Sequence, residues 1–435
     1  MKKTVALLLC LSVLLLSACG AKPADTRPAE TAAVTPAATG NVTPDENGDV
    51  TLSFDEQPVN TVEISLDKPA ASLVRIVSGG KTVYEREGEE QNLFCAFKTV
   101  RTDSLTVHIE TSATVKSVTP SHQTSDNREF RVTAYAVAES LLADGVLTAN
   151  SFDVVTDVIL FGCLDFDENG ELAVDAPLLE AALERLKSAV GDRDVRIYVN
   201  VLGPDSNGEG EWEDQMHDKA DRHNRAFKTG KLETAIPAVL DEYGFDGVFF
   251  DYEYPLRGKD WQAFSDFLGR LRTHTQKVIG LALAGWALLP KSAQFAAVDR
   301  VELMQYDLFD DNGNHSSLQT CVDGAVALDK VNYPLAQADM GLPFYGRPAD
   351  KSAEWPLYAD YVDRLGTTKD AVDTDEGKIY FNCRQTVYDK TAYALSRGMG
   401  GMMVWHYALD FTDVTNGNSL FGAIGECLAD RVTAD

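Results

Sequence analysis

Apolar and polar positions alternate in short runs from residue 50 to residue 118. Alternation with a period of two residues is the pattern of strands that bury one face, and Gly79-Gly80 and polar turns separate the runs. The runs lie at 50–54, 61–66, 73–77, 93–97 and 105–110. We therefore expect a small all-β, sandwich-like domain over residues 47–120. It lacks the Cys…Trp…Cys spacing of true immunoglobulin domains, so only the architecture is predicted.

After Phe130 the hydrophobic pattern changes. Strand-like runs now recur at spacings that leave room for a helix between them. Helical patterns lie at 177–190 and 261–276. Strand-like runs lie at 131–137, 157–164, 195–202, 247–253, 278–284, 301–307, 338–346 and 401–408. Strands that alternate with helices predict an α/β fold with a parallel sheet, and eight repeats predict a (β/α)8 TIM barrel over residues 128–432. In such barrels the chemistry lies at the C-terminal ends of the strands.

The N-terminus has the layout of an export signal. Two lysines precede the apolar run 4–16, which is too short to span a bilayer as a helix and is typical of a secretory signal peptide over residues 1–19. The run ends in Leu16-Ser17-Ala18-Cys19, which resembles the lipobox of bacterial lipoproteins, so Cys19 is the predicted lipidation site. An ordinary signal peptide with a chance cysteine is the alternative. Residues 20–46, rich in Ala, Thr and Pro, predict a flexible linker.

These features predict a protein that lies outside the cytoplasm and is lipid-anchored to a bacterial membrane. The chain carries 39 Lys and Arg against 67 Asp and Glu, a net charge of −28, which repels phosphate backbones and argues against a nucleic acid partner. A neutral polysaccharide is indifferent to that charge. The cysteines beyond Cys19 are widely spaced and odd in number, so we expect buried thiols rather than disulfides or a zinc site.

The stretch 245–255, Phe-Asp-Gly-Val-Phe-Phe-Asp-Tyr-Glu-Tyr-Pro, is the most informative part of the chain. Side chains alternate along a strand, so Phe249, Asp251 and Glu253 share one face. If that face points into the barrel, two carboxyl groups lie together at its mouth. Two carboxylates so close together raise the pKa of at least one of them, which can keep that carboxylic acid protonated near neutral pH. A strand end with ordinary solvated acids is the alternative interpretation.

This stretch resembles the DGxDxDxEYP signature of glycoside hydrolase family 18, the chitinase family. Further runs resemble the motifs of that family in the same order along the barrel. They are Met304-Gln305-Tyr306-Asp307, Gly341-Leu342-Pro343-Phe344-Tyr345-Gly346, and Gly400-Gly401-Met402-Met403-Val404-Trp405 with Asp410. The resemblance implies hydrolysis of β-linked N-acetylglucosamine glycans by a retaining, substrate-assisted mechanism with one protein acid.

Carried over by position, Glu253 is the implied general acid and base. Asp251 is expected to orient the 2-acetamido group of the substrate, and Tyr306 to hydrogen-bond its oxygen. The implied substrate-binding residues are Asp307, Trp405, Tyr135 and Gln305, with Trp405 as the apolar floor beneath the sugar. The resemblance implies no metal and no cofactor.

Two departures from the family pattern bear on activity. Phe249 stands where the family usually has its middle Asp, and the third strand reads Tyr198-Val199-Asn200-Val201-Leu202-Gly203 instead of ending in S-x-G-G. A sugar-binding protein with little or no turnover is therefore the alternative function. The substrate is left open between chitin-like chains, peptidoglycan-type glycans and an N-glycan core. The β domain is a spacer or a glycan-binding module, and its lack of tryptophan favours the spacer.

Overall fold

The structure is a computed structural model of the 435-residue chain that describes residues 30–33, 44–253, 255–284 and 289–433. The predicted signal peptide with Cys19, and residues 20–29 and 34–43 of the predicted linker, lie outside the described residues. Within the described ranges, no helix is both long enough and apolar enough to cross a membrane.

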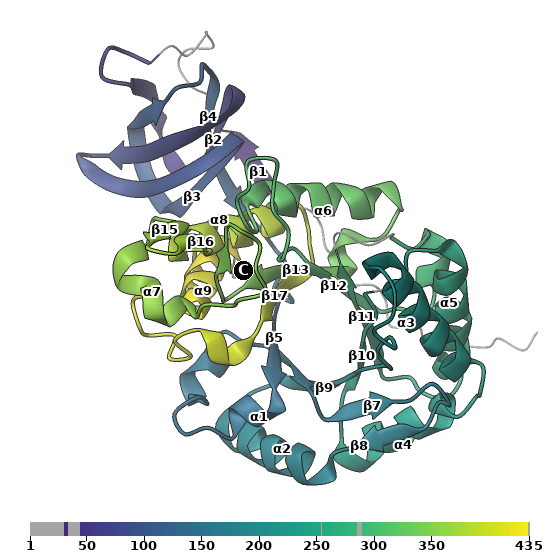
Figure 1. Ribbon diagram of the computed structural model, residues 1–435. Helices are drawn as coiled ribbons and strands as arrows, with labels where there is room; N and C mark the ends of the chain where they lie inside the picture. The colour runs from purple at the N-terminus through teal and green to yellow at the C-terminus, as the bar shows by residue number, and fades with distance from the viewer. Residues whose placement is uncertain (1–29, 34–43, 254, 285–288, 434–435) are drawn as a thin grey trace, which may run out of the picture.

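Eight parallel strands close into a barrel, viewed along its axis in Figure 1. In chain order they are β5 (Arg131–Val137), β6 (Asp157–Phe161), β9 (Arg196–Val201), β10 (Gly247–Asp251), β11 (Val278–Ala284), β12 (Arg300–Met304), β13 (Ala338–Pro343) and β17 (Gly401–Trp405). Each corresponds to one of the eight predicted runs, and neighbours in the barrel follow chain order. The prediction of a (β/α)8 barrel is thus confirmed.

Helices surround the barrel, and both helices predicted from the sequence are present. The helices are α1 (Ala138–Leu141), α2 (Ala176–Val190), α3 (Trp212–Phe227), α4 (Leu232–Tyr243), α5 (Gly258–Arg272), α6 (Leu318–Lys330), α7 (Tyr358–Leu365), α8 (Arg384–Ser396) and α9 (Leu420–Arg431). Short strands extend two loops: β7 (Leu164–Phe166) with β8 (Leu172–Val174), and β14 (Arg347–Pro348) with β15 (Ala371–Thr374) and β16 (Gly377–Tyr380).

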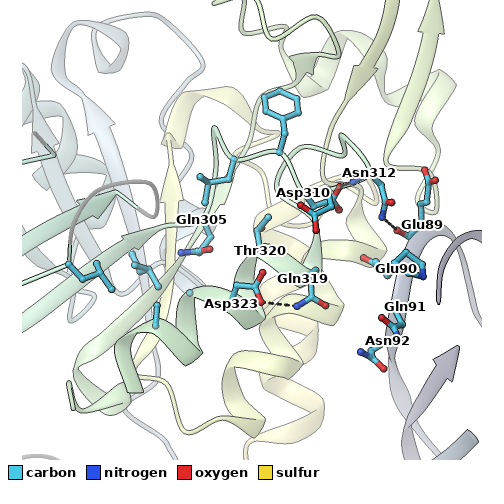
Figure 2. Close-up of a pocket in the computed structure, with 18 residues that line it drawn as sticks. Glu89, Glu90, Gln91, Asn92, Gln305, Asp310, Asn312, Gln319, Thr320 and Asp323 are labelled. Carbon is cyan, nitrogen blue, oxygen red and sulfur yellow. Dashed lines mark hydrogen bonds between the residues drawn. The ribbon is translucent and has the colours of Figure 1, made fainter. Parts of the chain in front are cut away.

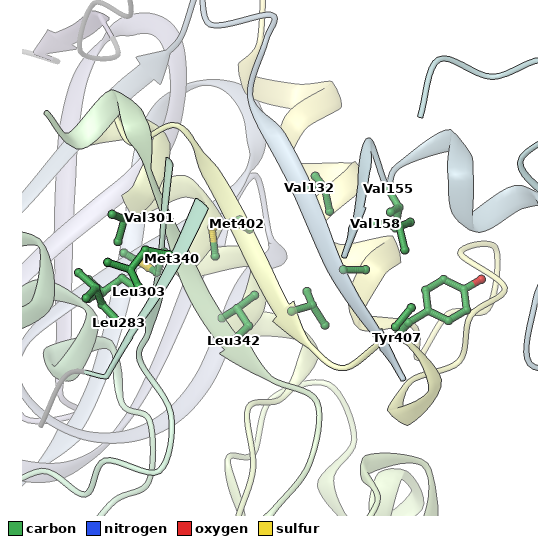
Figure 3. Close-up of a cluster of buried hydrophobic side chains, with 14 of the residues drawn as sticks. Val132, Val155, Val158, Leu283, Val301, Leu303, Met340, Leu342, Met402 and Tyr407 are labelled. Atoms are coloured by element: carbon green, nitrogen blue, oxygen red, sulfur yellow. The ribbon is translucent and has the colours of Figure 1, made fainter. Parts of the chain in front are cut away.

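The main core lies between the outer face of the strands and the helices. Figure 3 shows part of it, with Val132, Val158, Val301 and Met402 among the buried side chains. Cysteines at positions 95, 163, 321, 383 and 427 are buried and free, which confirms the prediction of buried thiols. Burial of this continuous apolar shell is the main force that closes the barrel.

The barrel interior carries charge at the N-terminal ends of the strands. The buried guanidinium of Arg300 donates to Asp157 at 2.7 Å and to Glu302 at 2.7 Å. Burial raises the pKa of Glu302 to about 8, with the nearby charge of Asp339 as a second cause. An aromatic layer that contains Tyr198 and Phe249 separates this charged floor from the mouth of the barrel.

The N-terminal domain is an antiparallel sheet in the order β1-β4-β2-β3. Its strands are β1 (Glu30–Ala33), β2 (Asp49–Ser78), β3 (Lys81–Thr111) and β4 (Val115–Thr124). The five short strands expected from the sequence are segments of just two long ones, β2 and β3. Val74 pairs with both Arg86 and Ile109, so the sheet folds over onto itself around a separate core. Register shifts along the ladder bend the strands without ending them.

A buried polar interface joins the β domain to the barrel beside α8 and α9. Asp389 of α8 accepts hydrogen bonds from the Tyr84 hydroxyl at 2.9 Å and from the Ala96 amide at 2.9 Å. Arg86 is 2% exposed and forms ion pairs with Asp370 at 3.3 Å and Asp389 at 3.5 Å. Since Tyr84, Arg86 and Asp389 are buried and bond to specific partners, they fix the orientation of the two domains.

Candidate active site

Strand β10 places the two carboxylates of the signature at the mouth of the barrel. Val248, Phe250 and Tyr252 lie in the core between strands and helices, whereas Phe249 lies in the separate cluster inside the barrel. The predicted alternation is therefore confirmed, and Asp251 lies one step above Phe249 on the inner face. Tyr254 of the same signature lies outside the described residues.

Asp251 and Glu253 form a hydrogen-bonded carboxyl pair. Burial raises the pKa of Glu253 well above its usual range, and the charge of Asp251 raises it further. Burial also raises the pKa of Asp251, while its hydrogen bond with Glu253 and the charge of Lys219 oppose that rise. Two half-buried carboxyl groups that share a hydrogen bond hold one proton between them, and the larger rise leaves it on Glu253. The pair can thus supply a proton near neutral pH.

Phe249 fills the space directly beneath this pair. Its ring is fully buried, lies 5.2 Å from the ring of Tyr198, and has the guanidinium of Arg300 at 4.9 Å from its centre. Gly280 pairs with Phe249 in the ladder between β10 and β11. The apolar ring offers no hydrogen bond to Asp251 from below.

Polar side chains from three other strands surround the carboxyl pair. Tyr306, just past β12, is 7% exposed, and Tyr135 of β5 is 2% exposed. Burial raises the pKa of both phenols, and the charges of Asp251 and Glu253 contribute to both rises, which places the hydroxyls near the pair as neutral donors. Among the described residues, neither the Tyr135 hydroxyl nor the amide of buried Asn200 has a hydrogen-bond partner. These groups are available to a polar ligand.

Trp405 provides an apolar wall at the end of β17. Its half-buried ring packs edge-to-face on Phe161 at 5.0 Å and at a tilt on Tyr135 at 5.6 Å. Aromatic packing on two sides holds the indole in place, and such a surface matches the apolar face of a sugar ring.

Asp307 adopts a left-handed backbone with φ of 56° and is held by three side chains, those of Tyr345, Arg347 and His315. Its carboxylate accepts a hydrogen bond from the Tyr345 hydroxyl at 2.9 Å and is paired with Arg347. Its backbone N–H donates to Nε2 of His315 at 2.9 Å. Tyr345 lies in one of the matched motifs, whereas no sequence pattern identified Arg347, on the short strand β14, or His315, in the loop after β12.

Gln305 is the one predicted substrate-binding residue that lies apart from the rest. Gln305 and Tyr306 are adjacent, so their side chains point to opposite faces of the strand end. The Gln305 amide lies behind β12 against Gly324 of α6, and not inside the barrel. The expectation that Gln305 contacts a sugar bound beside Glu253 is therefore wrong.

Residues 156–410 match the family model described as Glycosyl hydrolases family 18. The chain belongs to glycoside hydrolase family 18. It is 25% identical, over 248 aligned residues, to Chitinase A1 of Niallia circulans, an alignment that covers 39% of this chain and 36% of that protein. The chain thus spans about a third of the length of that curated relative.

Solved chitinase structures share the fold. A chitinase from Bacteroides thetaiotaomicron superposes with a TM-score of 0.55 at 19% identity, and covers 70% of this chain and 98% of that one. ChiB, a family 18 chitinase of Flavobacterium johnsoniae, superposes with a TM-score of 0.53 at 22% identity, and covers 69% of this chain and 94% of that one. The shared region corresponds in size to the family 18 barrel.

Proposed function

We propose that this protein is a glycosidase that cleaves β-linked N-acetylglucosamine glycans by substrate-assisted catalysis. The half-buried, hydrogen-bonded pair of Asp251 and Glu253 carries the proposal. Family 18 hydrolases use a substrate-assisted mechanism with one protein acid. That mechanism requires a carboxyl group whose pKa is raised enough to keep it protonated near neutral pH.

In the proposed reaction, Glu253 donates its proton to the glycosidic oxygen as the bond from that oxygen to the anomeric carbon breaks. The carbonyl oxygen of the substrate's own 2-acetamido group attacks the same carbon and forms a cyclic, positively charged intermediate. Asp251 stabilises that charge, and the neutral Tyr306 hydroxyl donates to the acetamido oxygen. Water then attacks the anomeric carbon, breaks its bond to the acetamido oxygen and gives a proton to the Glu253 carboxylate. The two successive displacements at that carbon retain its configuration.

Chitin-like chains are the substrate class that the relatives support best. The relatives described above are chitinases, and a mutant of the class V chitinase of Nicotiana tobaccum was solved in complex with an N-acetylglucosamine tetramer. Reducing-end assays on chitooligosaccharides, peptidoglycan and a high-mannose glycoprotein test the assignment. We expect turnover of chitooligosaccharides with the β-anomer as first product. Cleavage of the glycoprotein alone would favour an endo-β-N-acetylglucosaminidase, and turnover of none of the three would refute the proposal.

A sugar-binding protein without efficient turnover is the second candidate, and the Phe249 ring beneath Asp251 is the observation that favours it. The retained acid, Glu253, favours the enzyme. Incubation of the wild-type protein with a chitooligosaccharide separates the two: binding with release of shorter products identifies an enzyme, whereas stable binding of the intact chain identifies a binding protein.

We also propose that the protein is exported and held on a bacterial membrane by a lipid on Cys19. The sequence around Cys19 supports this proposal. Cys19→Ser should move the protein from the membrane fraction to the soluble fraction of the host cell, measured by blot. Unchanged membrane association of Cys19→Ser would refute lipid anchoring.

A further inference from the structure

A second cavity lies between the β domain and the barrel, on the outer side of β12 (Figure 2). Its volume is about 680 Å³, within the range of ligand pockets, ~300–1,000 Å³. The β domain contributes one wall through residues 89–92, and the loop after β12 together with α6 contributes the other. Pockets of this size commonly form at domain interfaces.

The buried amide of Gln305 lines this cavity. Gln305 is 1% exposed, and among the described residues neither Oε1 nor Nε2 has a hydrogen-bond partner. A buried amide without partners costs free energy, roughly 1–3 kcal/mol for each unpaired group, unless a ligand or water pairs with it. Gly324 of α6 makes room for the amide, since a Cβ there would lie 2.3 Å from Nε2 of Gln305. The helix thus carries a glycine in its interior where Gln305 needs space.

The chemistry of the walls selects the ligand. The described lining residues include carboxylates and amides but no Lys, Arg or His, which disfavours an anion. Gln305 requires both a donor to Oε1 and an acceptor for Nε2. An ammonium group has only donors and leaves Nε2 unpaired, whereas sugar hydroxyls and an acetamido group provide both. We propose that this cavity is a second binding site for neutral, N-acetylated oligosaccharides.

Both domains build the site, and their contacts hold it open. Asn312 of the barrel donates to the backbone carbonyl of Glu89 at 3.1 Å across one end of the cavity, as Figure 2 shows. On the same strand, β3, Arg86 is buried in ion pairs with the barrel. Walls fixed before binding reduce the ordering cost of binding a flexible chain. The β domain is then a part of glycan recognition and not only a spacer.

This inference extends the proposed function but does not depend on hydrolysis. The test is calorimetric titration of the Glu253→Gln protein with triacetylchitotriose, in which the number of bound equivalents is measured. Two double variants carry a second change in the cavity: Gln305→Leu removes the amide, and Gly324→Ala displaces it. Gln262→Leu on α5, an exposed glutamine bonded to Asp266, is the matched control. Thermal melting of each variant establishes that it is folded.

We expect both cavity variants to bind one equivalent fewer than Glu253→Gln, and the Gln262→Leu control to bind the same number. If the site beside Glu253 takes no glycan, the cavity variants lose all binding, which refutes the proposed function and leaves the second site standing. Equal stoichiometry in Glu253→Gln and in both folded cavity variants would overturn the second site.

Discussion

The ring of Phe249 occupies the volume that a side chain at Gly280 would need. A Cβ at position 280 would lie 2.0 Å from the nearest ring carbon, and the two residues are paired in the ladder between β10 and β11. The ring is fully buried and has Tyr198 and Arg300 against it, so it has little freedom to move. The aromatic replacement of a polar family residue is thus accommodated by a glycine on the neighbouring strand.

Gly280→Ala should destabilise the barrel. The added methyl group meets a ring that cannot shift, and overpacking of this kind costs about 1–3 kcal/mol of unfolding free energy. Urea denaturation measures the change, with Gly269→Ala on α5 as the control, because a Cβ at 269 meets nothing within 4 Å. Gly269→Ala, in the interior of α5, should raise the free energy of unfolding by roughly 0.5–1 kcal/mol. A Gly280→Ala protein as stable as wild type would contradict the packing described.

Phe249→Asp should shift the alkaline limb of kcat/KM to lower pH. In the wild type, burial and the charge of Asp251 raise the pKa of Glu253. An Asp at 249 can share a proton with Asp251 and turn it away from Glu253, which removes the second cause and lowers that pKa. Since kcat/KM reports the free enzyme and activity needs protonated Glu253, activity is then lost at a lower pH. The alkaline limb reflects the titration of the coupled pair Asp251 and Glu253, and not of one residue alone.

The Phe249→Leu protein is the control for that experiment, because it removes the ring without adding a carboxyl group. Its alkaline limb should coincide with that of the wild type. If the limb of Phe249→Asp also coincides, Phe249 only fills the barrel and has no effect on the carboxyl pair. Turnover by Phe249→Asp but not by the wild type would favour the sugar-binding alternative.

Arg86→Met should weaken the interface between the domains. It leaves the buried Asp389 and Glu90 without their cation, and removal of one member of a buried ion pair costs about 3–5 kcal/mol. Arg101→Met is the matched control, since Arg101 and its partner Glu56 are both 67% exposed. An exposed pair contributes at most ~1 kcal/mol. Equal urea midpoints for the two variants would show that the buried pairs do not hold the domains together.

The barrel could be predicted from the sequence because its strands are short apolar runs separated by amphipathic helices. Each of the eight runs became a strand within a few residues of the expected ends. The strands of the β domain were harder to predict. Alternation locates the straight segments, but it does not show whether a strand ends between two segments or bends and continues. Five predicted strands therefore merged into β2 and β3.

The candidate site, too, could be predicted from the sequence only in part. Alternation along β10 placed Asp251 and Glu253 correctly on the inner face, and the same rule applied to the end of β12 separates Gln305 from Tyr306. The position of Gln305 beside Tyr306 in the motif, taken alone, wrongly predicts that Gln305 lies in the active site. Arg347 on β14 and His315 in the loop after β12 hold Asp307. The positions of both segments depend on tertiary packing, so no local pattern identified these residues.

The Glu253→Gln variant tests the central claim most directly. Glutamine keeps the shape of the side chain but cannot donate the proton, and general acid catalysis contributes about 10²–10⁴-fold. The initial rate of chitooligosaccharide hydrolysis should therefore fall by at least two orders of magnitude, while the Kd for the same sugar stays within a few-fold of the wild-type value. Hydrolysis at the wild-type rate by Glu253→Gln would contradict the assignment of Glu253 as the acid.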